Sequence, residues 1–296
     1  MRIRVLGAAA GGGFPQWNCG CPNCEAVRRG DPAFRAATQD SLAVSADGDS
    51  WLLLNASPDI RAQIHAFPGL HPRAARHSPI AGIVLTNGDL DHILGLFSLR
   101  ESTPLVLYAT DAVRAGLGEN VILRTLQRFP EQLTLRRLVL GRPVQANGLE
   151  IEAFAAPGKR PVHLERVSAP TPEDNIGLVI RDAAGGSMAY IPGVAAQGGD
   201  GHARLAGVDT IFFDGTFWAS DELVRLGLSK ARAEDMAHWP VGGAAGSLAV
   251  LAGLPGRKIL THVNNTNPIL RADSPERRAV LAAGVEIAFD GMELKA

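Results

Sequence analysis

The chain of 296 residues has 46% hydrophobic residues, a formal net charge of −1 and three cysteines. This composition is typical of a globular protein with a sizeable core, and the small net charge gives no reason to expect nucleic acid as a partner. No apolar run reaches about 18 residues, so we expect no membrane insertion. The short alternating N-terminus favours a first strand over a signal peptide, and we expect a cytoplasmic protein.

The predicted first strand covers residues 2–9 and runs into Gly11, Gly12 and Gly13. The spacing differs from the dinucleotide-binding pattern G-x-G-x-x-G, and no helix pattern follows at once. We therefore interpret these glycines as a tight turn, or as a place where the backbone passes close to another group.

All three cysteines lie within six residues, at Cys19, Cys21 and Cys24. Such clustering in a cytosolic protein favours a metal site over a disulfide, and three thiolates leave zinc one ligand short of a tetrahedral set. The fourth ligand would come from a histidine or from a carboxylate such as Asp40. The alternative is a redox pair with a spare thiol. We predict a structural zinc that orders the irregular residues at about 10–40.

The next elements are a hairpin over 41–55 and a helix after Ser57 and Pro58. A buried strand at 80–85 then leads to a loop at 87–92 and a helical pattern over 93–99. Asp91 and His92 fall at the start of that helix. Carboxylate and imidazole are ligands of first-row metals. The alternative is that Asp91 caps the helix and His92 is an ordinary surface residue.

The second half of the chain alternates strand patterns with loops that carry polar residues. Strands are expected within 133–155, in a hairpin over 175–191, at 209–214, at 258–262 and at 285–289. The strand at 209–214 ends in Asp214, and the strand at 258–262 ends in His262. A turn cap explains Asp214 equally well, and His238, in a loop before a helix, is either a pocket wall or a packed structural histidine.

Three strands of one expected sheet thus end in residues that bind metals: Asp91 with His92, Asp214, and His262. In an α/β protein, side chains at the carboxyl ends of strands commonly form the site. Mixed nitrogen and oxygen ligands suit Zn, Fe or Mn, and an imidazole–carboxylate set with open positions is typical of non-heme Fe(II) chemistry.

The segment 87–92 resembles the metallo-β-lactamase superfamily motif H-x-H-x-D-H, with Asn87 and Asp89 in place of its first two histidines. Asp214 is similar to the later metal-bridging aspartate of that superfamily, and His262 to its final histidine ligand. The resemblance covers nearly the whole chain. It implies a metallo-β-lactamase-like α/β fold, a four-layer αβ/βα sandwich, formed by a single domain over 1–296 with the cysteine-rich zinc-binding loop at about 10–40.

The replacement of two motif histidines by Asn87 and Asp89 affects the first of the two metal sites of the superfamily. In the superfamily the two missing histidines bind the first metal with a third histidine near the loop at 156–161, and that loop contains none; His163 lies just past it. The resemblance therefore implies a mononuclear site, which does not fit ordinary two-metal hydrolysis.

More narrowly, five segments resemble a family that acts in the biosynthesis of the redox cofactor pyrroloquinoline quinone (PQQ). They are residues 8–24, 86–101, 212–216, 238–243 and 261–268. The resemblance implies an Fe(II)- and O₂-dependent hydroxylase that acts on the tyrosine ring of a peptide-derived, cross-linked Glu–Tyr unit, with other PQQ biosynthesis proteins as partners. The alternative is a non-catalytic carrier in the transport of PQQ or its precursor to the periplasm. A metal-dependent hydrolase ranks third, and a homo-oligomer is compatible with each of these.

The resemblance also assigns roles to residues. The active-site Fe(II), which zinc can replace in isolated protein, would be held by Asp91, His92, Asp214 and His262. His238 would move protons, and Asn87 and Asp89 would bind substrate groups or orient ligands. Substrate carboxylates would meet Lys159, Arg160, Asn265 and Asn267. Cys19, Cys21 and Cys24 match a structural zinc site, and Asn265 stands where related proteins have the histidine that is the fourth ligand.

Overall fold

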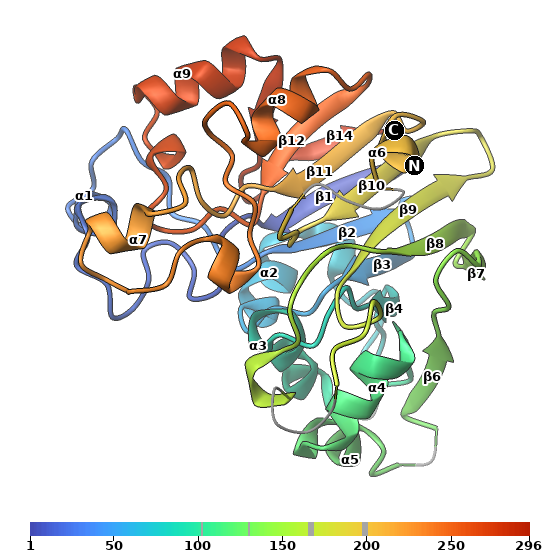
Figure 1. Cartoon of the computed structure of the whole chain (residues 1–296). Coiled ribbons are helices and arrows are strands. Elements are labelled where there is room, and N and C mark those ends of the chain that lie inside the picture. The colour runs from blue at the N-terminus through green and yellow to red at the C-terminus, as the bar shows by residue number, and fades with distance from the viewer. Residues whose placement is uncertain (102, 130, 165–168, 197–200) are drawn as a thin grey trace.

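In the computed structural model, two seven-stranded sheets pack face to face (Figure 1). The structure describes residues 1–101, 103–129, 131–164, 169–196 and 201–296. In spatial order, the first sheet consists of β14 (Glu293–Lys295), β1 (Arg2–Gly7), β2 (Ser41–Ser45), β3 (Trp51–Leu54), β4 (Ile80–Val84), β5 (Leu105–Ala109) and β6 (Leu133–Arg137). The second consists of β13 (Val285–Ile287), β12 (Arg257–Thr261), β11 (Thr210–Asp214), β10 (Ser187–Ile191), β9 (Ile176–Asp182), β8 (Leu149–Ala155) and β7 (Val144–Ala146).

Each sheet combines an antiparallel part with a parallel part. β3, β4, β5 and β6 run parallel in the first sheet, and β10, β11, β12 and β13 run parallel in the second. The predicted hairpins β2–β3 and β9–β10 are confirmed, because the segments 46–50 and 183–186 supply their turns.

Helices cover the outer face of each sheet (Figure 1). On the first sheet lie α2 (Ile60–Ala66), α3 (Leu90–Ile93), α4 (Asp111–Gly118), α5 (Val121–Leu126) and the 3₁₀ helix η2 (Leu94–Leu99). On the second lie α6 (Gly201–Leu205), α8 (Ser247–Ala252), α9 (Pro275–Ala282) and η5 (Pro268–Leu270). The remaining helices are α1 (Pro22–Arg28), α7 (Glu222–Arg225), η1 (Pro68–Leu70), η3 (Val162–Leu164) and η4 (Glu234–Met236).

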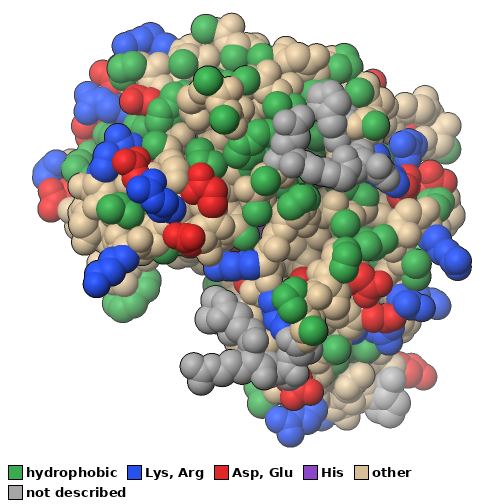
Figure 2. Space-filling view, viewed as in Figure 1, with side chains coloured by type: hydrophobic (Ala, Val, Ile, Leu, Met, Phe, Trp, Pro, Cys, Tyr) green, Lys and Arg blue, Asp and Glu red, His purple; other side chains and the backbone are tan. Residues whose placement is uncertain are grey.

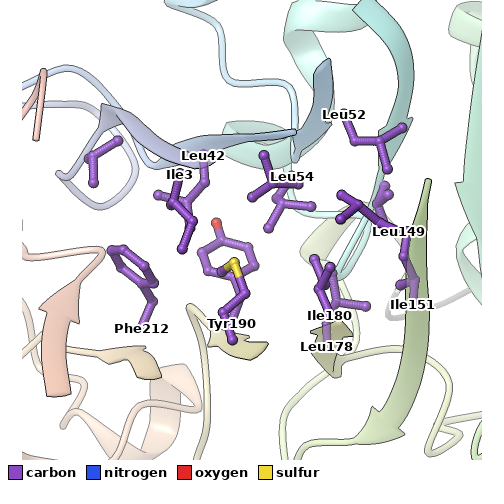
Figure 3. Packing of buried hydrophobic residues seen from close by; sticks show 14 of the residues in the cluster. Ile3, Leu42, Leu52, Leu54, Leu149, Ile151, Leu178, Ile180, Tyr190 and Phe212 are labelled. Carbon is purple, nitrogen blue, oxygen red and sulfur yellow. The ribbon is translucent and has the colours of Figure 1, made fainter. Parts of the chain in front are cut away.

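The apolar core forms three layers that match this architecture. The central layer joins the inner faces of both sheets, and Figure 3 shows Leu42 and Leu54 of the first sheet opposite Tyr190 of the second. Two outer layers join each sheet to its helices. The expected four-layer αβ/βα sandwich is therefore confirmed.

Several elements differ from the sequence-based expectations. Residues 22–28 form helix α1 where no helix pattern was expected, and residues 94–99 continue α3 as a 3₁₀ helix. The first strand ends at Gly7, and Ala9 forms isolated bridges to Gln39 and Val263 instead. The edge strand β14 was not expected.

No helix among the described residues is long and apolar enough to cross a membrane. On the face shown in Figure 2, acidic and basic side chains are interspersed, without a large area of one sign.

Candidate metal centre

The candidate site is a pocket of about 470 Å³ at which the loops after three strands meet. One loop follows β4 of the first sheet, and the others follow β11 and β12 of the second. The expectation that all three strands belong to one sheet was therefore wrong. Each sheet supplies one side of the pocket, because the carboxyl ends of these parallel strands lie at the same end of the sandwich.

The glycine turn after β1 packs against this pocket. A Cβ atom built at Gly11 would lie 3.1 Å from Oδ2 of Asp91, and Gly12 and Gly13 have φ values of 94° and 72°. Both expectations for these glycines are thus confirmed: the backbone turns tightly, and it passes close to a functional side chain.

Asp91, His92 and His262 form a compact set of metal-binding atoms. One carboxylate oxygen and two imidazole nitrogens lie within 4.8 Å of one another. Oδ2 of Asp91 is 3.2 Å from Nε2 of His262 and 3.9 Å from Nε2 of His92. Two imidazoles and one carboxylate beside an open pocket are a donor set that suits Fe(II) or Zn.

The hydrogen bonds of His92 prepare its Nε2 atom for a metal. Oδ1 of Asn87 accepts the backbone N–H of Asp89 at 3.0 Å, so this atom is the amide oxygen, and it lies 2.7 Å from Nδ1 of His92. His92 therefore carries its proton on Nδ1. The buried Nε2 atom has no hydrogen-bond partner among the described residues. Burial lowers the pKa of His92 to about 4, which keeps the ring in the neutral form that binds metals.

Thr216 orients the second imidazole. Its hydroxyl lies 2.9 Å from Nδ1 of His262 and donates to Oδ1 of Asp214 at 2.6 Å, so it accepts the Nδ1 proton of His262. This arrangement directs Nε2 of His262 toward Asp91. His262 has a φ of 55°, a left-handed conformation that non-glycine residues seldom adopt.

The space between Asp91 and His262 favours positive charge. Burial lowers the pKa of His262, but the hydrogen bond to Asp91 and the charges of Asp91, Asp40 and Asp214 outweigh burial and raise it to about 9. Burial alone would raise the pKa of Asp91, yet His92 and His262 hold it well below its usual range. A divalent metal would supply the charge that a proton supplies without it.

Asp214 and His238 form a second set that shares His262 with the first. Nδ1 of His238 is 2.7 Å from Oδ2 of Asp214, and the His238 ring stacks on that of His262 with centroids 5.4 Å apart. Oδ2 of Asp214 also accepts the backbone N–H of Val194 at 2.9 Å. The structure thus surrounds Asp214 with donors and groups it with His238, apart from Asp91.

Asp89 and Lys159 line the same pocket. Burial and the charge of Asp91 raise the pKa of Asp89 to about 6, against the opposing effect of Lys159. Both residues lie at the wall of the pocket, and their contact with substrate stays a prediction.

Three residues expected to bind substrate carboxylates lie elsewhere. Arg160 is 5% exposed and pairs with Asp174 at 3.7 Å, and Asn267 is fully buried and donates to the carbonyl oxygen of Gly215 at 2.9 Å. Asn265 points into the cysteine cluster. The loops turn these side chains inward, so their expected contact with substrate does not fit their positions.

The cysteine cluster is compact and buried. The sulfur atoms of Cys19, Cys21 and Cys24 come within 4.8 Å of one another, and Nδ2 of Asn265 lies 3.1, 3.6 and 3.2 Å from them. Burial raises the pKa of Cys21 to about 12. Asp40 hydrogen-bonds to Tyr190 and Thr261 instead, so it is not the fourth partner of the cluster.

Sequence reasoning missed three residues of the pocket. Thr216 links Asp214 to His262, and Asn264 and His163 line the pocket. The sequence positions of Thr216 and Asn264 could have indicated them, since they lie two residues after Asp214 and His262, which were already selected. His163 carried no signal beyond its proximity to the loop at 156–161.

Comparisons with known proteins agree with the fold and indicate the family. Residues 50–263 match the model of the β-lactamase superfamily domain. The chain is 45% identical to coenzyme PQQ synthesis protein B of Methylobacterium sp. (strain 4-46) over 300 residues, 99% of each chain. It is also 45% identical to the protein of that name from Xanthomonas campestris pv. campestris (strain B100), again over 99% of each chain. Its fold matches the crystal structure of Zn²⁺-bound PqqB from Methylobacterium extorquens with a TM-score of 0.95, 43% identity and full coverage of both chains.

Proposed function

The chain belongs to the coenzyme PQQ synthesis protein B family of the β-lactamase superfamily, and from this premise we propose that it is a metal-dependent enzyme of PQQ biosynthesis. The proposed reaction is the iron- and O₂-dependent hydroxylation of the tyrosine ring of a cross-linked Glu–Tyr unit. Other proteins of the pathway would supply this substrate in the cytoplasm.

The observation that carries the proposal is the set formed by Asp91, His92 and His262 at the open pocket. Two histidines and one carboxylate that leave positions free for other ligands are the pattern of non-heme Fe(II) oxygenases. Asn87 and Asp89 stand where a two-metal hydrolase has histidines, and Asn87 is already engaged with His92. These features favour a mononuclear centre over a hydrolase.

The metal would be held by His92 and His262 through Nε2 and by Asp91 through Oδ2, with Asp214 as the further ligand that the resemblance implies. Bound Fe(II) would supply the activation of O₂. The Nε2 atom of His92, which has no hydrogen-bond partner in the described part of the chain, and the donor set itself fit such an ion.

The surrounding residues would orient these ligands and the substrate. Asn87 and Thr216 each hold one imidazole through its Nδ1 proton. His238, whose Nδ1 donates to Asp214, would present Nε2 for proton transfer at the substrate ring. Lys159 and Asp89 line the pocket, and we expect Lys159 to meet a substrate carboxylate and Asp89 an ammonium group.

We propose zinc for the cysteine cluster. Three thiolates need a fourth partner, and the Asn265 carboxamide lies at hydrogen-bonding distance from all three sulfurs.

The test of the reaction is anaerobic reconstitution with Fe(II), followed by a single exposure to O₂ with a synthetic cross-linked Glu–Tyr substrate. We expect mass spectrometry to show oxygen gained on the tyrosine ring. Zinc-loaded protein and His262→Ala should show none, because one cannot activate O₂ and the other lacks a ligand.

A matched control is His65→Ala, which changes an exposed histidine of α2 outside the pocket and outside the metal-binding set. It should retain iron and oxygen transfer. If fully iron-loaded protein binds the substrate without oxygen gain, the hydroxylase proposal fails and the carrier becomes the better explanation. Two metals per active site would favour a hydrolase.

A further inference from the structure

Directly beneath the pocket, a carboxylate is buried between the two sheets. Asp40 is 1% exposed, and its backbone N–H donates to the carbonyl oxygen of Ala9 at 2.7 Å. Among the described residues, no lysine or arginine forms an ion pair with it. Burial raises its pKa to about 6. Burial of an ionised carboxylate costs several kcal/mol unless hydrogen bonds or an opposite charge compensate it, and the charge of His262 opposes the effect of burial on Asp40.

One oxygen of this carboxylate connects to the second sheet. Oδ1 of Asp40 accepts the hydroxyl proton of Thr261, the last residue of β12. The next residue is His262, whose left-handed backbone turns its side chain into the pocket. Asp40 is therefore one hydrogen bond and one peptide unit away from a proposed metal ligand.

The other oxygen starts a second chain of hydrogen bonds. Oδ2 of Asp40 accepts the hydroxyl proton of Tyr190 on β10, and Tyr190 in turn accepts a proton from Nδ2 of Asn55 at 3.2 Å. Tyr190 belongs to the second sheet, and Asn55 follows β3 of the first, so this chain crosses the sandwich. Figure 3 shows the Tyr190 ring reaching across the central layer toward Leu42 and Leu54.

This second chain ends at the other half of the site. Oδ1 of Asn55 accepts both the backbone N–H of Thr86 at 2.9 Å and its hydroxyl proton at 3.1 Å. Asn55 adopts a φ of 64°, so it, like His262, is a left-handed residue at the end of a strand. Thr86 directly precedes Asn87, the residue that holds His92 by its Nδ1 atom.

We propose that Asp40 is a positioning residue of the metal centre, which fixes His262 from one sheet and His92 from the other at the spacing that a single ion requires. Each oxygen of Asp40 starts one chain of hydrogen bonds, which we call an arm: one runs through Thr261 to His262, and the other runs through Tyr190, Asn55 and Thr86 to Asn87. The inference rests on the proposed metal centre, and it is independent of which reaction the metal supports.

The two arms together require a carboxylate. An ionised carboxylate accepts hydrogen bonds on both oxygens, and bonds from hydroxyls to such a charge are short and strong. A carboxamide would accept from Thr261 or from Tyr190 and present N–H groups to the other. Asp40→Asn therefore removes the negative charge and reverses the direction of one of the two hydrogen bonds, while the volume of the side chain is kept.

The test uses Co(II) as a spectroscopic probe of the full-length apoprotein. Co(II) affinity and its visible absorption spectrum are measured for Asp40→Asn, for Thr261→Val and for Tyr190→Phe. Subtracting the spectrum of His262→Ala isolates the active-site ion from any ion at the cysteines. We expect a weakening of ~100-fold for Asp40→Asn and of ~10-fold for each single-arm variant, as for other residues that orient metal ligands, with altered spectra.

Asp290→Asn is the matched control, because it shows what the same substitution does at an aspartate that only stabilises the fold. Asp290 also accepts several hydrogen bonds, from the backbone N–H groups of Ala8 and Thr38 at 3.1 and 2.7 Å, and it has no described contact with a ligand. It should lower the thermal stability and leave the Co(II) spectrum unchanged. If Asp40→Asn does not fold, the two single-arm variants decide the question.

The outcomes separate the two proposals. If folded Thr261→Val and Tyr190→Phe bind Co(II) with wild-type affinity and spectrum, the role of Asp40 is overturned. If the wild-type protein gives no Co(II) signal that depends on His262, the metal centre itself is overturned.

Discussion

At the scale of single residues, the site depends on which nitrogen of each imidazole carries the proton. His92 and His262 both donate Nδ1–H, to Asn87 and to Thr216, and this leaves both Nε2 atoms facing Asp91. Partners of this kind fix the ring orientation and the basicity of a metal ligand. The geometry of the proposed metal centre is therefore built into the hydrogen bonds of the protein itself.

The role of Asn87 leads to a prediction about metal affinity. Asn87→Ala removes the acceptor for Nδ1 of His92, so the proton can move to Nε2 and block the lone pair. We expect the active-site metal affinity to fall by ~10–100-fold. Competition titration of the apoprotein with Co(II) against a chelator of known affinity measures this change.

Asn87→Asp provides the rescue, because a carboxylate also accepts from His92 and from the backbone N–H of Asp89. Its affinity should return to within a few-fold of the wild type. Equal weakening in Asn87→Ala and Asn87→Asp would show that Asn87 acts in another way than by orienting His92.

The same scale shows what the sequence could predict of the site. Asp91, His92 and His262 were selected because they lie in the segments that follow buried strands, and the structure brings their ligand atoms within 4.8 Å of one another. The positions of Arg160 and Asn265 do not fit the substrate contacts expected of them, because the direction of a loop side chain depends on backbone turns and on distant partners. Nothing local in the sequence indicates that Asn265 would meet cysteines about 240 residues away.

At the scale of elements, strands with clear turns were predictable and context-dependent elements were not. The turn at Asn147 and Gly148, with φ values of 51° and 74°, joins β7 to β8 as their sequence indicates. Strand β14, with three residues, has no pattern of its own and exists through its pairing with β1. β4 lies in a different sheet from β11 and β12, and this depends on which strands pair with one another. Hydrophobic periodicity does not show which strands pair, so this could not be predicted.

Helix α1 illustrates an element that needs outside support. It has seven residues, too few for stability in isolation, and it carries Cys24 with Cys21 as its N-cap. Asn23 donates to the carbonyl oxygens of Asn265 and Asn267, both at 3.1 Å. A zinc ion among the sulfurs would fasten this helix to the loop after β12.

This proposal predicts a stability increment from zinc. In the His262→Ala protein, where the cysteine site alone remains, free zinc at 1,000 times its dissociation constant should raise the free energy of unfolding by ~4 kcal/mol. The further substitution Cys24→Ser should abolish the increment, because it removes a thiolate. Denaturant unfolding with and without zinc measures both values.

Asn265→His tests the fourth position of the same site. An imidazole at this position would complete the tetrahedral set, so zinc affinity should rise above that of the wild type. For the preceding prediction, if zinc still raises the free energy of unfolding of the Cys24→Ser protein by the same amount, the three cysteines are not the zinc ligands.

At the scale of the whole molecule, the ends of the chain complete the first sheet. The family model matches residues 50–263, whereas β1, β2 and β14 lie outside that range and pair with one another. The amino group of Met1 also binds the side chain of Asp182 on β9 and donates to the carbonyl oxygen of Ala296 at 2.8 Å. The segments outside the match are thus part of the same sandwich, which supports the proposal of a single domain over 1–296.

This architecture predicts one cooperative unfolding transition. The central layer joins both sheets, so neither sheet can keep its inner face buried after the other unfolds. Calorimetry of the metal-free protein should give equal calorimetric and van't Hoff enthalpies. Ile180→Ala, a fully buried change in this layer, should cost ~2–5 kcal/mol and shift the whole transition without splitting it.

The matched control for this prediction is Leu281→Ala on α9, where the side chain is 51% exposed, and its cost should stay within ~0.5 kcal/mol. A transition that splits into two steps in Ile180→Ala would mean that the sheets are separable units joined by a weak interface. The site would then be assembled only when the sheets dock, since Asp91 and His92 follow a strand of one sheet and His262 a strand of the other. A single transition instead means that the fold and the spacing of the metal ligands form in the same step.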